Sequence, residues 1–499
     1  MLADFQVKYA EFWQNPTSAS RTWLALLFGV LGCAVWIQHS TDPEKATSAP
    51  HDEFFHYRSQ CTISMASANC TTPGKYKVEA SIIYAGMEYL QSSSSTTGIS
   101  MLVEMVSWQA TMMGYHRDPE NYSHISPFGG EMRRRSWLSL SVMDCLVAWQ
   151  TGLPPVLLKG RGDTIYPRNL LDEDFGPATK RLPPSRSETT DLSNITYMVA
   201  VERMLSLANK IAHLPDGQQS PENTTSLQQE LDEAWSKVPS TLRSFNTSDN
   251  DGSAMVKIST LEITYQRARC ILYRPYLASR QDYLSHQIFH FDCVDAASRI
   301  LDCQIQMYQS AFSQPQYRYQ AWFGVSRSIC DCLTATMVVY LEIITSIKEN
   351  ELQAHRKSVK LIKSLKSSYD SWMSCPRPSL ETVKAAELLG NMLNIIGNLD
   401  MSAIRHSELS TIQKEAKEGA SLDESQFSYD DYSQAAMWDT FTSLSSFDLI
   451  DWVGRFSLSD ISSVTNFTNS KPKNLWDQEM QQLNNISTGN TYGRKGFPG

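Results

Sequence analysis

The 499 residues of this chain are enough for about three average domains or for one large helical array. Hydrophobic residues make up 41% and aromatic residues 10%, so most of the chain is expected to fold around a substantial core. The formal net charge of −9 excludes a protein that binds nucleic acid through the positive field of its whole surface. Ten scattered cysteines with no C-x-x-C pair indicate reduced, mostly buried thiols.

The first 115 residues show the three- and four-residue apolar spacing that is typical of helices. The sequence predicts an opening helix that ends before Pro16, then a buried helix over Trp23–Ile37. The buried helix is about fifteen residues long and falls short of the ~20 residues that span a bilayer, which favours a core helix and no membrane span. Residues 40–60 are polar and predict a connector, whereas Lys75–Leu90 and Ile99–Tyr115 predict two antiparallel helices.

The most specific stretch of the sequence lies between Gly129 and Phe175. It begins with Gly-Gly and a run of three arginines, continues into a helical segment over Trp137–Gln150, and then enters a long irregular loop. The helical segment is followed by Gly152, Pro154 and Pro155. Glycine after the last turn and prolines beyond it are a strong signal for the end of a helix.

One face of this predicted helix carries a buried acid. Trp137, Leu140, Asp144 and Val147 recur at spacings of three and four residues and therefore share a face. An unpaired carboxylate among apolar neighbours costs several kcal/mol, so we expect a cationic or hydrogen-bonding partner for Asp144. Our candidate is Arg274, which precedes Pro275 in a YRPY stretch. We interpret the pair as structural rather than catalytic, because structural networks also bury carboxylates.

The arginine run, which consists of Arg133, Arg134 and Arg135, allows two interpretations. It could form a nuclear import patch or a phosphate contact. Its position within the motif favours intramolecular ion pairs with the acidic loop Asp172-Glu173-Asp174, because arginine binds carboxylates in a fixed bidentate geometry.

The helical pattern continues to about residue 400. Helices are predicted over Leu192–Leu214, Met255–Leu277, Phe291–Gln309, Trp322–Ile347, Val359–Met373 and Leu380–Ile396. Residues 216–252 are polar around one helix near Leu227–Val238 and predict a disordered insertion. Because no segment shows strand-like alternation, the sequence predicts an all-α fold, a large multi-helical array over residues 1–414.

Residues 415–499 have a different composition, in which acids alternate with aromatic side chains such as Trp438, Phe441 and Trp452. Arg455 is the single basic residue between Asp423 and Asp460. This mixture suits a largely disordered segment that folds as a short helix into the groove of a partner. A tail helix that docks on its own domain explains the composition equally well.

The sequence signatures of the main enzyme classes are absent, since G-x-S-x-G, H-E-x-x-H, G-x-x-x-x-G-K-[ST] and G-x-G-x-x-G do not occur. The best metal-like cluster is His286, His290 and Cys293, with the histidines one turn apart. Two exposed histidines and a buried thiol explain the same spacing, so we assign no catalytic residue, metal or cofactor.

The stretch MRRRSWLSLSVMDCLVAWQTGLPPVL, followed by PRNLLDEDF, resembles the central motif of the fungal-specific transcription factor regulatory domain, or middle homology region. Three further stretches are similar to segments of that family in the same order: the early helices around Phe12–Phe28, YQRARCILYRPYL at Tyr265–Leu277, and CVDAASRIL at Cys293–Leu301. The resemblance covers roughly residues 1–400.

This resemblance implies a nuclear transcription regulator of a metabolic or biosynthetic gene set. Its helical body would support a homodimer and could bind a small-molecule effector, and residues 415–499 would act as an activation segment that contacts the transcription machinery or co-regulators. Family members usually carry an N-terminal binuclear zinc cluster of six closely spaced cysteines, whereas the first cysteine here is Cys33.

DNA binding is therefore expected only if a zinc cluster is encoded upstream of Met1, in an exon that the gene model lacks. Otherwise the chain is a shortened regulator without its own DNA reader. The alternative class is an all-α ligand-binding protein or enzyme of a biosynthetic pathway. Convergent polar groups in a closed pocket around Asp144 and Arg274 would favour that alternative.

Overall fold

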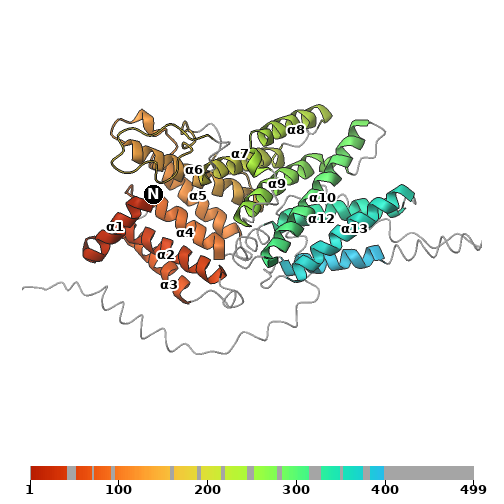
Figure 1. Cartoon of the computed structure of the whole chain (residues 1–499), viewed down its shortest axis with the longest axis horizontal. Coiled ribbons are helices and arrows are strands. Elements are labelled where there is room, and N and C mark those ends of the chain that lie inside the picture. Colours follow the sequence, from red (N-terminus) through yellow and green to blue (C-terminus); the bar gives the residue numbers. More distant parts are fainter. Residues whose placement is uncertain are drawn as a thin grey trace, which may run out of the picture. The chain divides into compact units, whose positions relative to one another are not determined.

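The computed structural model describes residues 2–41, 52–69, 72–91, 96–157, 162–187, 193–214, 220–243, 252–277, 284–313, 328–348, 352–374 and 382–397. The regular elements in these ranges are all helices, most of them labelled in Figure 1. The predicted all-α fold is therefore confirmed for the described part of the chain. The predicted tail segment over 415–499 lies outside the described residues.

The N-terminal part consists of α1 (Leu2–Gln14), α2 (Arg21–Thr41), α3 (Asp52–Ser67), α4 (Lys77–Gln91) and α5 (Thr96–Met112). Helix α2 packs against both α3 and α4. Gly32 permits the close approach to α4, because a Cβ atom at this position would lie 2.6 Å from Sδ of Met87. The predicted helix pair before and after residues 92–95 is confirmed as α4 and α5, which pack on one another.

Two predictions for this region are wrong in their boundaries. The connector predicted over 40–60 gives way to α3 at Asp52, because a polar sequence conceals a narrow buried stripe that includes Phe54 and Cys61. The helix predicted over Trp23–Ile37 is longer and runs from Arg21 to Thr41. By length and composition α2 is long and apolar enough to cross a membrane. Several of its side chains, including Trp23, are buried within the protein, as expected for a core helix.

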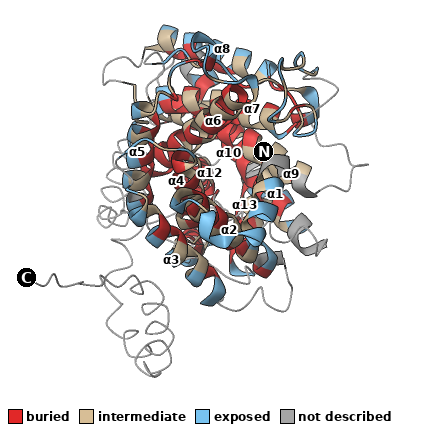
Figure 2. Ribbon diagram, turned by 90° about the vertical axis from the view of Figure 1, so that its left-hand side faces the viewer, coloured by how far each residue is buried: buried red, intermediate tan, exposed pale blue. Residues whose placement is uncertain are grey.

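Helix α6 (Pro127–Thr151) connects the N-terminal helices to the rest of the fold. It packs against α4 and α5 on one side and against α7 (Asn194–Ala212) on the other. Leu140 and Val147 belong to the hydrophobic core shared with α4 and α5, whereas Cys145 and Trp149 belong to the larger core formed with the later helices. Figure 2 shows buried residues along α6.

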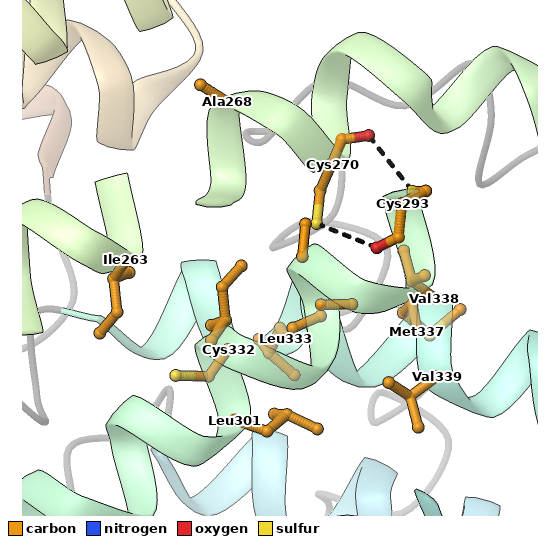
Figure 3. Close-up of a cluster of buried hydrophobic side chains, with 14 of the residues drawn as sticks. Ile263, Ala268, Cys270, Cys293, Leu301, Cys332, Leu333, Met337, Val338 and Val339 are labelled. Carbon is orange, nitrogen blue, oxygen red and sulfur yellow. Dashed lines mark hydrogen bonds between the residues drawn. The ribbon is translucent and has the colours of Figure 1, made fainter. Parts of the chain in front are cut away.

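The larger core is formed by α7, α8 (Pro221–Ser236), α9 (Gly252–Tyr273), α10 (Leu284–Ser313), α12 (Ile329–Lys348), α13 (Leu352–Met373) and a helix over 382–397. Small side chains bring α9 and α10 together. The thiols of Cys270 and Cys293 each donate a hydrogen bond of 3.7 Å to the backbone carbonyl of the other residue (Figure 3).

The helices predicted after residue 190 are confirmed where the structure describes them.

The helix predicted near Leu227–Val238 is confirmed as α8, and the disordered insertion predicted over 216–252 does not extend to residues 220–243. Helix α8 begins at an N-cap formed by Ser220, whose Oγ accepts a hydrogen bond from the amide of Asn223. Leu227 and Leu231 on this helix are buried in the larger core. This one buried face fixes the helix although its other faces are polar.

Candidate functional site

The candidate site is the arginine-rich first half of α6 together with the loops that it holds. Ser126 caps the helix, its Oγ accepting a hydrogen bond from the amide of Gly129 at 3.1 Å, and Pro127 occupies the first turn. The helix therefore starts ten residues before the predicted Trp137 and includes the arginine run. It ends as predicted at Gly152, whose φ of 71° lies in the left-handed region that favours glycine.

Arg134 forms a buried bidentate ion pair. Its Nε and Nη2 atoms donate to the two carboxylate oxygens of Asp118 at 3.0 and 2.6 Å, and the arginine side chain is only 1% exposed. Asp118 also accepts from the backbone amides of Glu120 and Ile165. Burial raises the pKa of the Asp118 carboxyl, but Arg134 and these amides lower it more, so the pKa lies below its usual range.

Arg135 forms the ion pair that the sequence predicted. Its Nη1 lies 2.6 Å from Oδ1 of Asp172, and its Nη2 donates to the carbonyl of Leu170 at 2.7 Å. The guanidinium also lies over the ring of Phe175, 4.7 Å from its centroid. On its own helix Arg135 also contacts the carboxylate of Glu131. Burial raises the pKa of Glu131, although the charge of Arg135 acts to lower it.

Arg133 points in a third direction. Its Nη2 donates to the carbonyl of Met113 at 2.5 Å, and its guanidinium lies 4.5 Å from the centroid of the Tyr115 ring. Consecutive helical residues are separated by about 100°, so three neighbouring arginines reach three different segments. An import patch or phosphate contact is wrong for Arg134 and Arg135, because both side chains are buried in ion pairs.

A second acid of the predicted loop, Asp174, pairs with Arg186 rather than with the arginine run. Arg186 donates from Nε and Nη2 to the carboxylate of Asp174 at 2.7 and 2.6 Å. The loop is thus closed on itself at one point and held to α6 by Arg135 at another. Sequence reasoning identified the acids but not this partner.

Asp144 holds the segment that follows α6. The side chain is buried, and its two oxygens accept hydrogen bonds from the amides of Val156 at 3.1 Å and Leu157 at 2.8 Å. These are the first amides available after Pro154 and Pro155, which have no N–H group. Burial raises the pKa of Asp144, and the two amides partly offset the increase.

The predicted inward orientation of Asp144 and its predicted need for a hydrogen-bonding partner are therefore confirmed. Leu140 and Val147 are buried on the same face of α6, and Trp137 is partly buried beside them. Arg274 as that partner is wrong, because the backbone of the exit segment already satisfies both oxygens. Arg274 lies with Pro275 in the short helix η4 (Arg274–Tyr276), near Arg267 and Cys293. Burial lowers the pKa of its guanidinium.

Another buried ion pair, which was missed from the sequence, connects α6, α9 and α12. Arg267 is 1% exposed and pairs with Asp331, and its guanidinium lies 4.2 Å from the centroid of the Trp149 ring. Burial raises the pKa of Asp331, and Arg267 opposes this shift. The available signal was Asp331 in the largely apolar sequence of α12, but nothing in the sequence indicated that it meets Arg267.

The metal-like cluster on α10 does not converge in the described residues. His290 Nε2 lies 3.2 Å from a carboxylate oxygen of Glu342, whereas the Cys293 thiol faces Cys270, and the side chain of His286 lies outside the described residues. Across the ranges that the structure describes, no group of three or more His, Cys, Asp and Glu side chains is placed to hold a metal ion. The charged side chains around α6 are paired with neighbouring loop segments, so the arrangement can fix these loops.

The site is thus part of an all-α domain in which buried arginines fix irregular loops. In comparison with known families, residues 3–244 match the family model of the fungal specific transcription factor domain. Residues 3–244 of this chain therefore form a fungal specific transcription factor domain. The resemblance identified from the α6 motif is thus confirmed. No solved structure matches the chain.

Several curated relatives extend the similarity beyond residue 244. The Zn(2)-C6 fungal-type transcription factor mpsB of Macrophomina phaseolina is 28% identical over 415 residues, which are 80% of this chain and 56% of the relative. The Zn(2)-C6 fungal-type transcription factor pigI of Monascus ruber is 28% identical, covering 78% of this chain and 49% of the relative. The equisetin cluster transcription factor eqxF of Fusarium heterosporum is 28% identical, and the similarity covers 81% of this chain and 60% of the relative. The chain thus spans about half the length of the curated relatives it matches.

Proposed function

We propose that this chain is the regulatory region of a fungal transcription factor that controls a biosynthetic gene set. The observation that carries the proposal is the extent of the similarity, which covers about 80% of the chain and reaches transcription factors named for the equisetin and fusarisetin A clusters. The buried ion pairs of α6 support a regulatory rather than an enzymatic role, because their charged groups are already bonded to loop residues. We place the protein in the nucleus.

DNA contact in this proposal is made by a zinc cluster of the kind that the relatives are named for, and not by the helical body. The chain has a net charge of −9, and Arg134 and Arg135 of its most specific motif are buried in ion pairs. Purified chain is expected to show no sequence-specific shift of promoter DNA in a gel assay. A specific shift that survives physiological salt would overturn this division of labour.

Residues 415–499 serve as the activation segment in this proposal. Acids alternate with aromatic residues in this sequence, a composition typical of segments whose aromatic side chains are buried in a partner groove on binding. The partners would be the general transcription machinery or co-regulators. Residues 1–414 would form the folded body that positions this segment and supports assembly.

A reporter assay tests this division between body and tail. Residues 415–499, residues 1–414 and the whole chain are each fused to a foreign DNA-binding domain and expressed in yeast. The tail fusion is expected to activate the reporter, and the body fusion is not. A matched tail in which Trp438, Phe441, Phe447 and Trp452 are replaced by alanine should lose activation while keeping its acids. Equal activation by the altered tail, or none by the natural one, would refute the assigned role.

A further inference from the structure

Helix α5 has two apolar faces, and only one of them is used by the fold. Its inward face includes Val103, Val106 and Ala110, which are buried in the core shared with α6. Its outward face carries four large apolar side chains at the surface: Met101 is 70% exposed, Met105 54%, Trp108 66% and Met112 77%. Exposed residues of α5 are visible along its outer side in Figure 2. We call these four residues the α5 seam.

The spacing of the α5 seam is that of a coiled-coil contact. Its members follow one another at intervals of four, three and four residues, which is the a/d pattern of a heptad repeat. Single exposed apolar residues are ordinary on a protein surface, but a contiguous stripe on one helix face marks an interaction site. Three of the four are methionines, whose flexible side chains adapt well to a facing helix.

We propose that the α5 seam pairs with the α5 seam of a second copy of this chain, with the two helices antiparallel about a twofold axis. The intervals of four, three and four residues are the same in both chain directions. Two antiparallel copies of the α5 seam therefore place apolar side chains opposite one another along its whole length. With the axis between Met105 and Trp108, Met101 faces Met112 of the second copy, and Met105 faces Trp108 of the second copy. Antiparallel pairing also aligns the two helix dipoles favourably.

The chemistry of α5 fits this partner better than it fits a charged one. Glu104 is the single charged residue in the helix, so two copies bring little like charge together. The antiparallel register places each Trp108 ring against a Met105 side chain, a pairing that gives a sulfur–aromatic contact. A parallel register would instead oppose the two bulky Trp108 rings.

The area of the α5 seam is consistent with a self-association site. At roughly 200 Å² for a side chain of this size, the exposed fractions leave on the order of 500 Å² per copy. Two copies together would bury about 1,000 Å², which is the lower limit of a specific interface. This figure assumes that the whole exposed area of the four side chains is buried, so flanking residues must contribute as well. The predicted dimer is therefore one that dissociates measurably on dilution.

Sedimentation velocity of the full chain over a range of concentrations tests the proposal. Wild-type protein should form a dimer, and Trp108→Glu should weaken the dimer roughly thirty-fold or more, because it places a charge at the centre of the interface. The matched control is Met373→Glu, which changes a methionine that is 61% exposed on α13, away from the α5 seam. This control should dimerise like wild type. A monomeric wild type, or unchanged association of Trp108→Glu, overturns the proposal.

Cross-linking of full-length chains tests the register and does not depend on a destabilising charge. Met101→Cys and Met112→Cys chains are mixed and treated with a short bismaleimide, with wild-type chain as the background from native cysteines. The mixture should give a cross-linked dimer, and either variant alone should not, because identical positions would lie about 16 Å apart along the helices. Cross-linking within each single variant, or none in the mixture, overturns the antiparallel pairing.

Discussion

Replacing Arg134 by methionine tests whether the buried ion pair of α6 stabilises the fold. The substitution keeps an unbranched side chain of similar reach but removes both hydrogen bonds to Asp118, which lies at 7% exposure. Removing one partner of a buried pair costs about 3–5 kcal/mol, because the other charge is left uncompensated. The exposed pair Arg117–Asp163 in the same region provides the control: Arg117→Met should cost less than about 1 kcal/mol.

The expected loss converts into a thermal shift that is easily measured. A folded body of roughly 400 residues unfolds with an entropy of about 0.8 kcal/mol per kelvin, so 3–5 kcal/mol lowers the Tm by about 4–6 °C. Differential scanning calorimetry of Arg134→Met, Asp118→Asn and the double variant gives the coupling between the two residues. Independent, additive losses in the double variant would refute the ion-pair interpretation.

The pH dependence of this effect has a defined sign. The pKa of Asp118 is lowered in the folded protein, so the stability that it contributes is present above the unfolded pKa, near 4, and is lost as the pH falls through the folded value. The difference in Tm between wild type and Arg134→Met should therefore be full at pH 7 and should narrow below about pH 4. A difference that is constant down to pH 3 would show that Asp118 is not the group involved.

Three further substitutions test the other contacts of α6. Asp144→Ala removes the acceptor for the amides of Val156 and Leu157, so unfolding free energy should fall by about 1–3 kcal/mol and chymotrypsin should cut the exit segment faster than in wild type. Gly152→Ala should lower stability in thermal denaturation by about 1–2 kcal/mol, since φ is 71°, and Gly152→Asn should cost less. Arg267→Leu should cost about 3–5 kcal/mol in urea denaturation and change the fluorescence of Trp149, whereas adding Asp331→Leu should recover part of the loss. Wild-type stability in any of these variants would contradict the corresponding contact.

The sequence predicted those parts of the fold that depend on local physics. The stop at Gly152 and the inward face around Asp144 followed from helix periodicity and capping, which act within a few residues. The start of α6 was missed because the arginines mimic a solvated segment, although each of them is satisfied by a tertiary partner. Helix α3 was missed because its buried stripe is only a few residues wide.

Pairing between distant residues was the part that the sequence did not supply. Arg135 and Asp172 belong to one motif, and their contact was predicted because the motif itself limits the choice of partners. Nothing in the sequence distinguishes Asp118 or Asp331 from the other acids of the chain as a partner for a particular arginine. Their ion pairs with Arg134 and Arg267 were therefore found only in the structure. The wrong choice of Arg274 for Asp144 has the same origin, since the correct partners are backbone amides that no side-chain pattern reveals.

The regulatory role is tested most directly by measuring messenger RNA in a strain from which the gene for this chain has been deleted. If the chain regulates a biosynthetic gene set, its deletion should change the transcript levels of the adjacent biosynthetic genes together and leave unlinked housekeeping transcripts unaltered. Reintroducing the intact gene should restore the wild-type transcript levels. Adjacent transcripts that stay at wild-type levels under conditions in which the gene is normally expressed would contradict this role.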